Sequence, residues 1–149
     1  MRAVIQRVKS ASVSVDGAIT GQVGAGFLIY LGVQSGDTET DLAYITKKVL
    51  GLRVFSDADD KMNLSIKDVG GGALVVSQFT LLGDARRGTR PSFSDAAEPS
   101  VANELYTAFI GQLKDAGITA ECGVFGADMA VSSINDGPVT VLLDSRRLF

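Results

Sequence analysis

The residues best suited to chemistry are two hydroxyls, Ser77 and Thr80, within the stretch Ser77-Gln78-Phe79-Thr80-Leu81 at the end of an apolar run. A hydroxyl nucleophile needs a neighbouring base, yet the chain has no histidine, and no lysine or carboxylate stands beside these residues in sequence. Covalent catalysis by either hydroxyl is therefore disfavoured. Two interpretations remain: a strand end whose hydroxyls cap backbone groups, or the mouth of a site where main-chain N–H groups stabilise an oxyanion.

A second marker is the dipeptide Gly137-Pro138. An ordinary trans turn is the default, because only about 5–6% of X–Pro bonds in folded proteins are cis. A cis bond would point successive carbonyls in a similar direction, and proline contributes an acceptor without a donor. Such a pair can hold an ammonium group. The residues alone do not choose between the two interpretations.

Three arginines, Arg86, Arg87 and Arg90, form a short basic cluster between Asp84 and Asp95. The cluster is either a solvated surface loop or a contact for phosphates, because the guanidinium fork fits phosphate oxygens. The same residues can bind RNA without base specificity. Both interpretations stay open.

The sequence predicts neither a metal nor a nucleotide cofactor. Histidine ligands are absent, and Cys122 is the lone cysteine, so it has no partner for a disulfide or a cysteine cluster. The stretch from Asp57 to Met62 departs from a calcium loop, because Lys61 replaces an oxygen ligand and Met62 replaces the turn glycine. The glycine-rich stretches 24–26 and 70–72 also lack the residues of dinucleotide and phosphate loops.

The composition indicates one globular domain over residues 1–149. Apolar residues make up 46% and charged residues 21%, which excludes a disordered chain. The net charge is 14 − 17 = −3, which argues against a basic protein that coats nucleic acid. The single cysteine, the lack of a signal-peptide pattern and the lack of a long apolar run lead us to expect a cytoplasmic protein with no membrane span.

The elements that must position these residues are mostly strands. We expect turns at Asp16-Gly17 and at Asn135-Asp136-Gly137-Pro138. A short strand is expected near Arg53-Val54-Phe55. Patterns of alternating or continuous apolar residues predict the remaining strands at 3–8, 11–15, 19–23, 26–31, 73–79, 119–122, 129–134 and 139–143.

Two helices interrupt the strands. Thr38 and Asp41 resemble a capping box, followed by one apolar helix face of Leu42, Ile45, Val49 and Leu52. The second helix is expected to start near Ser100 and to stop at Gly117, with a face of Val101, Leu105, Phe109 and Leu113. The predicted class is α+β: a single domain with a mostly antiparallel, curled, barrel-like sheet and two main helices.

The motifs together resemble the D-aminoacyl-tRNA deacylase family (D-tyrosyl-tRNA deacylase type) along essentially the whole chain. The main matches are Ser77-Gln78-Phe79-Thr80-Leu81 and Asn135-Asp136-Gly137-Pro138-Val139-Thr140. Supporting matches are residues 1–8, 61–65, Arg90-Pro91-Ser92-Phe93, and Phe125-Gly126-Ala127 with Met129. One departure is Leu82, where the family commonly has an aromatic residue.

The resemblance implies hydrolysis of the ester that joins a D-amino acid, or glycine, to the 3′ end of tRNA. It also implies a homodimer with two active sites at the subunit interface. One subunit supplies the segment 77–81, and the other inserts Gly137-Pro138 with a cis bond. The implied partners are therefore the 3′ end of an aminoacyl-tRNA and a second copy of the chain, without a metal or cofactor.

The resemblance also implies residue roles. The catalytic residues would be Ser77, Gln78, Phe79 and Thr80, with oxyanion stabilisation from main-chain N–H groups around the last three. The substrate-binding residues would be Arg7, Met129, Gly137 and Pro138. Arg7 would brace the Gly-Pro loop; its other interpretation is a strand-surface residue in a salt bridge.

The missing histidine suits this chemistry, because the ester is activated and the ribose 2′-OH of the substrate can help to orient water. Two other functions remain as alternatives. The chain can be a non-catalytic RNA-binding dimer that uses only the arginine cluster. It can also be a serine or threonine hydrolase with a covalent intermediate.

Overall fold

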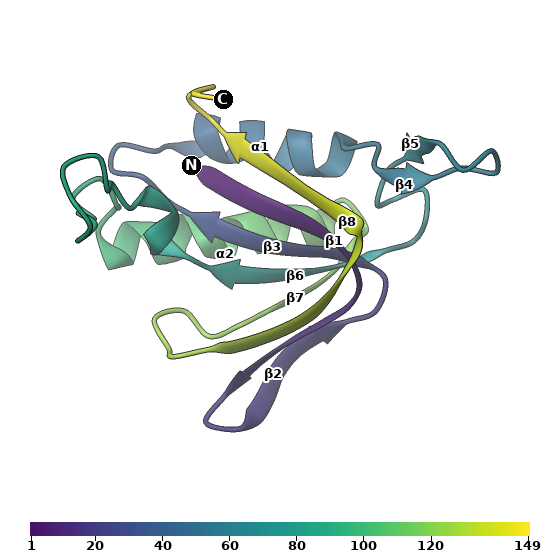
Figure 1. The fold of residues 1–149 in the computed structure, drawn as a ribbon, viewed down its shortest axis with the longest axis horizontal. Helices are drawn as coiled ribbons and strands as arrows, with labels where there is room; N and C mark the ends of the chain where they lie inside the picture. The colour runs from purple at the N-terminus through teal and green to yellow at the C-terminus, as the bar shows by residue number, and fades with distance from the viewer.

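The computed structural model describes all residues 1–149, and its two helices and eight strands are labelled in Figure 1. The strands are β1 Arg2–Val15, β2 Ala18–Val23, β3 Gly26–Gly32, β4 Phe55–Ser56, β5 Met62–Leu64, β6 Gly72–Ser77, β7 Thr119–Cys122 and β8 Ala130–Asp144. The helices are α1 Glu39–Gly51 and α2 Pro99–Asp115, with a 3₁₀ turn η1 at Phe79–Leu82. None of the helices has the length and apolar character that a bilayer crossing requires.

The main sheet is built around the long strand β1. Antiparallel partners of β1 are β2, β3 and β8, whereas β3 pairs with β6 and β6 with β7 in parallel. The sheet order is β2-β1-β3-β6-β7, with β8 paired to β1 outside this path. The predicted class, a mostly antiparallel curled sheet with two helices, is confirmed.

Both helices cover one face of the sheet, behind the strands in Figure 1. The main core joins strand residues such as Ile5, Phe27 and Val75 to helix residues such as Ile45 and Phe109. A smaller cluster of Val8, Ala11, Val13, Leu28, Leu74 and Val76 fills the opposite side of the curled sheet. Strand β3 contributes to both clusters, because successive side chains point to opposite faces.

The sequence signals that predict the two helices are largely local, and both helices are confirmed. Thr38 caps α1: its hydroxyl accepts from the N–H of Thr40, and the Asp41 carboxylate accepts from the N–H of Thr38. Helix α2 begins at Pro99, one residue before the expected start. Val101, expected on the buried face, is 44% exposed, and Ala102 is buried instead.

Three expected boundaries are wrong. Segments 3–8 and 11–15 form the single strand β1, and the strand expected over 73–79 ends at Ser77. Asn135–Pro138, expected as a turn between two strands, lies inside the continuous strand β8. Residues 135–138 stay within one strand because both halves of β8 pair with the same long strand β1, so the chain continues in one direction and bulges.

The amino group of Met1 is held in a buried ion pair. Its nitrogen lies 2.7 Å from Oδ2 of Asp37, and neither side chain is exposed. The N–H of Gln34 donates to the same oxygen at 2.6 Å, and the amino group also donates to Oγ of Ser145 at 2.6 Å. This network joins the start of β1 to the segment before α1 and to the end of β8.

We expect Asp37→Asn to lower the free energy of unfolding by about 3–5 kcal/mol, because breaking a buried ion pair leaves one charge uncompensated. Urea unfolding measures the change. The matched control is Asp59→Asn in an exposed turn, which should change stability by less than about 0.5 kcal/mol. Equal effects of the two substitutions would contradict a stabilising role for this ion pair.

Candidate functional site

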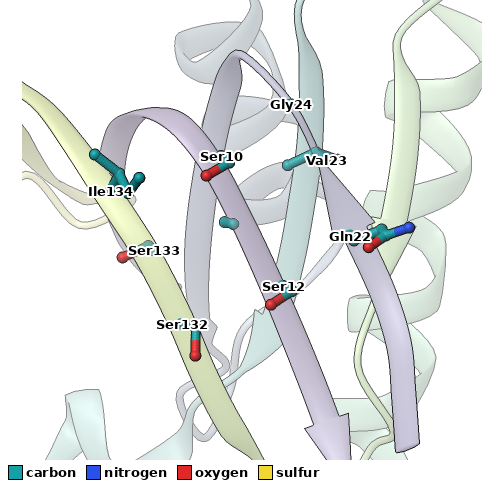
Figure 2. A pocket seen from close by; sticks show the side chains of 9 residues that line it. Ser10, Ser12, Gln22, Val23, Gly24, Ser132, Ser133 and Ile134 are labelled. Carbon is teal, nitrogen blue, oxygen red and sulfur yellow. The ribbon is translucent and has the colours of Figure 1, made fainter.

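Two surface hollows are candidates for a site. One, of about 650 Å³, lies on β1, β2 and β8 and is lined mainly by hydroxyl and amide side chains without any ionisable group (Figure 2). The other, of about 600 Å³, opens where β6 ends and is lined mostly by apolar residues. It contains Ser77, Gln78, Phe79 and Met129, four of the residues singled out by sequence. We therefore take this second hollow, the β6-end pocket, as the candidate site.

The chain geometry at the end of β6 leaves main-chain donors near the pocket. The N–H of Gln78 donates to the carbonyl of Leu31 at 2.8 Å, so this group is already used. The turn η1 follows, and its first bond runs from the N–H of Leu81 to the carbonyl of Gln78 at 3.3 Å. The N–H groups of Phe79 and Thr80 precede that bond, in the position where a helix start leaves donors without partners inside the helix.

Two side chains of this segment are joined by a hydrogen bond. The amide Nε2 of Gln78 donates to Oγ1 of Thr80. Because that oxygen accepts from Gln78, the hydroxyl proton of Thr80 remains available to a substrate or a water. Phe79 is 55% exposed at the rim, in an edge-to-face contact with Phe93 at a centroid distance of 5.2 Å.

Helix α2 fixes the opposite wall of the pocket. The hydroxyl of Tyr106 donates to the carbonyl of Val75 in β6 at 3.0 Å, and burial raises the pKa of this phenol. The Tyr106 ring packs against Phe125, whose ring lies on the pocket wall. Met129 reaches the wall over Gly123, where a Cβ atom would lie only 2.5 Å from the methionine sulfur.

Gly137-Pro138 projects from a bulge in β8, and its peptide bond is cis. Gln6 pairs with Thr140, and Val8 pairs with Asn135. Between these two pairs β1 has one residue, number 7, whereas β8 has four, numbers 136–139. The surplus residues cannot join the ladder. They bulge outward, and this places Gly137 and Pro138 on the exposed surface.

Arg7 lies beneath this bulge. Its Nε donates to the carbonyl of Asp136 at 3.2 Å and lies 3.3 Å from the Asp136 carboxylate, and Nη1 donates to the carbonyl of Val54. A Cβ on Gly137 would lie 2.9 Å from Nη2 of Arg7. Both interpretations of Arg7, a salt bridge and a contact beneath the Gly-Pro loop, describe parts of its surroundings.

The two sets of predicted residues lie apart within one chain. Through β3, Arg7 is in register with Ala73 of β6. Ser77 lies four positions further along β6, about 13 Å at the rise of an extended strand. The strands β1 and β3 also separate β8 from β6. One chain therefore brings Ser77, Gln78 and Phe79 together with Met129 in the pocket lining, and Thr80 follows just outside that lining. It does not bring Gly137-Pro138 to them.

Sequence reasoning missed several residues of both regions. The pocket wall includes Ala96 to Pro99 and Ala102, and it carries two carboxylates, Glu98 and Asp128. No sequence pattern marks these residues, because a few apolar residues before a helix and single carboxylates occur in many proteins without a binding role.

Asn135 and Thr140, whose side chains link the two ends of the bulge, stand out in the sequence only as parts of a motif. The side-chain oxygen of Asn135 accepts from the N–H of Val139 at 3.2 Å, and its amide donates to Oγ1 of Thr140 at 3.1 Å. The arrangement explains why asparagine and threonine stand at these two places in the motif.

Comparisons with known proteins show the family to which the chain belongs. The family described as "D-Tyr-tRNA(Tyr) deacylase" matches residues 4–144. Two similar relatives are proteins called D-aminoacyl-tRNA deacylase. The protein from Anaeromyxobacter dehalogenans (strain 2CP-C) is 60% identical and that from Alkaliphilus metalliredigens (strain QYMF) is 54% identical, each over all of both chains.

A solved structure described as "c-Myc DNA Unwinding Element Binding Protein" is also similar. It has a TM-score of 0.91 and 38% sequence identity, and the match covers 97% of this chain and 98% of that one. The family match spans nearly the whole sequence, and the relatives named above are identical at more than half of their positions. The chain therefore belongs to the D-Tyr-tRNA(Tyr) deacylase family and is a hydrolytic enzyme.

Proposed function

We propose that the protein hydrolyses the ester between a D-amino acid, or glycine, and the 3′-terminal ribose of tRNA. The observation that supports this most directly is the end of β6, where the motif Ser77–Leu81 turns away from the sheet beside an apolar pocket. Membership of the deacylase family supplies the substrate class.

The β6-end pocket suits the terminal nucleoside of the RNA. Its volume, about 600 Å³, lies within the usual range for small-ligand sites of about 300–1,000 Å³. The exposed rings of Phe79 and Phe93 offer faces for base stacking. The carboxylates of Glu98 and Asp128 can accept hydrogen bonds from ribose hydroxyls.

The hydrolytic step then needs little from side chains. Water attacks the ester carbonyl, and negative charge develops on the carbonyl oxygen. The N–H groups of Phe79 and Thr80 stabilise this oxyanion, because the N–H of Gln78 is already bonded to Leu31. The bond between the carbonyl carbon and the ribose 3′-oxygen then breaks, and this oxygen leaves with the proton that the water gives up. The 2′-OH of the substrate orients the water and assists that proton transfer. The Thr80 hydroxyl, held by Gln78, donates to substrate or water and forms no acyl-enzyme.

Selection by chirality is assigned to the Gly-Pro bulge of a second copy of the chain. The carbonyls of Gly137 and Pro138 accept hydrogen bonds from the substrate ammonium, and proline offers no competing donor. With ester and ammonium fixed, a D side chain faces outward and an L side chain meets the wall.

A second subunit is needed because one chain keeps the two segments about four strand positions apart. Strand β8 pairs only with β1 and presents Ile134 and Leu142, which are 58% and 55% exposed. Both features support a homodimer with its active sites at the interface.

The direct test compares D-tyrosyl-tRNA with L-tyrosyl-tRNA and measures the amino acid released. The D ester should be cleaved and the L ester should not. Release of neither would favour the alternative of a non-catalytic RNA-binding dimer, and equal release of both would contradict selection by chirality.

A D-tyrosyl-tRNA with a 2′-deoxy terminal adenosine should be cleaved at least about 10²-fold more slowly, because the substrate hydroxyl acts in the proton transfer.

Thr80→Ala should slow the reaction by no more than about tenfold, equivalent to about 1.4 kcal/mol. Single-turnover quench followed by mass measurement should find no acylated protein. Abolished turnover in Thr80→Ala with a trapped acyl group in the unsubstituted enzyme would favour the covalent hydrolase.

Gly137→Ala should lower kcat/KM for D-tyrosyl-tRNA by about 10²-fold, the cost of misplacing a binding group by about 1 Å. Gly137 has a φ of +122°, and its added Cβ would lie 2.9 Å from both Arg7 Nη2 and Val139 Cγ2. The matched control is Gly24→Ala, where no atom lies within 4 Å of the added Cβ; it should keep full activity.

Gly137→Ala also tests whether the active site is formed by two subunits, when it is combined with a second variant. Phe79→Pro removes one oxyanion donor while fitting the first position of a helical turn. Co-expressed with Gly137→Ala under separate tags, it forms heterodimers with one site built entirely from unchanged segments. Purified heterodimers should regain about half the activity of the unsubstituted dimer. No recovery would contradict an interface site.

A further inference from the structure

The basic cluster lies on a loop whose ends are fixed. Asp84 and Ser92 exchange two backbone hydrogen bonds, of 2.8 and 2.9 Å, and so close the loop that we call the 84–92 loop. Gly88 turns the chain at the tip with a φ of +148°, and a Cβ atom added there would have no other atom within 4 Å. The loop therefore projects from a closed base into open space.

The base of the loop is attached to the β6-end pocket. The N–H of Gly83 donates to the carbonyl of Thr80 at 3.0 Å, directly before the loop begins. Phe93, directly after it, contacts Phe79 at the pocket rim. The position of the tip is thus tied to the segment proposed to hold the ester.

The three arginines are not equivalent. The guanidinium of Arg86 donates two hydrogen bonds to the Asp84 carboxylate, at 2.9 and 2.8 Å, and its main-chain N–H donates a third at 2.9 Å. These bonds from Arg86 hold the pKa of Asp84 well below its usual range, so the pair stays ionised and its charges cancel. Arg87 and Arg90 are exposed and lie in no ion pair.

The loop therefore adds two unpaired positive charges beside the pocket of a chain whose net charge is −3. Such a local charge orients a polyanion without binding it along the whole surface. Exposed guanidinium groups fit phosphate oxygens through paired donors.

The length of the loop indicates which phosphates of the RNA its arginines can reach. Arg87 lies three positions from Asp84 and Arg90 lies two positions from Ser92, so each is up to about 10 Å of extended chain from the closed base. A stacked nucleic-acid strand rises about 3.4 Å per nucleotide. With the terminal adenosine in the pocket, Arg87 and Arg90 stand beside the two or three nucleotides that precede it.

We propose that Arg87 and Arg90 bind the phosphates of the RNA strand leading into the terminal adenosine, whereas Arg86 braces the loop through Asp84. This inference rests on the proposed function and assigns the loop to the RNA portion of that substrate. The loop positions the RNA and takes no part in the hydrolytic step.

The experiment uses the double variant Arg87→Gln with Arg90→Gln and two substrates, D-tyrosyl-tRNA and 3′-O-D-tyrosyl-adenosine, which has no phosphate. For the tRNA substrate kcat/KM should fall about tenfold at low salt, and the slope of log affinity against log salt should shrink by about 1.4, or 0.7 for each lost contact. For the adenosine ester kcat/KM should stay unchanged.

The matched control removes two exposed lysines far from the pocket, Lys67→Gln with Lys114→Gln. Lys114 lies in the last turn of α2, whereas the first turn of that helix lines the pocket. The control makes the same change in net charge and should leave both substrates and the salt slope nearly unchanged.

The outcomes separate the two proposals. If the unsubstituted protein cleaves neither substrate, the proposed function fails and the role of the loop fails with it. If it cleaves both, an arginine variant with unchanged tRNA kinetics and salt slope overturns the loop's role alone. An equal loss on both substrates also overturns it, because the arginines would then act on the ester-binding segment.

Discussion

The ladder between β1 and β8 determines how the Gly-Pro segment is presented. Pairs at Gln6–Thr140 and Val8–Asn135 hold both sides of the bulge, so the four residues between them must leave the sheet opposite a single residue, Arg7. The guanidinium of Arg7 fills the space beneath and binds main-chain carbonyls on two segments. A rigid sheet therefore presents Gly137-Pro138, and its orientation does not depend on a flexible loop.

The same strand β1 also places the other segment. Its register with β3, and that of β3 with β6, puts Ser77 toward one end of the sheet and Arg7 toward the other. Loop motion cannot bring the segments together, because every intervening strand is hydrogen-bonded to its neighbour. A site that uses both segments must form between two copies of the chain. Strand register therefore supports the proposed dimer, whereas the premise that both segments serve one site comes from the family resemblance.

Much of this fold could be predicted from local sequence signals. The features that could not be predicted depend on contacts between residues that lie far apart in the sequence. The Thr38 cap was readable because capping depends on residues three positions apart. The continuity of β8 was not, because Asn-Asp-Gly-Pro has the composition of a turn and only pairing with a distant strand makes it a bulge. The exposure of Val101 was not readable either, because its four-residue spacing from Leu105 does not show which side chains in the first turn of α2 the rest of the fold covers. The motif residues around Gln78 were identified by resemblance, whereas the apolar wall near Ala102 had no signature.

Selection by handedness requires three fixed points of reference on the substrate. In the proposed site these are the ester, held by N–H groups after β6; the terminal nucleoside, held in the β6-end pocket; and the ammonium, held by carbonyls of the partner's bulge. The groups acting on the ester and the ammonium belong to the main chain, so no side-chain titration alters them. Their positions follow from strand register. A histidine would add a proton carrier to such a site but no further point of reference, and discrimination between mirror images depends only on the points of reference.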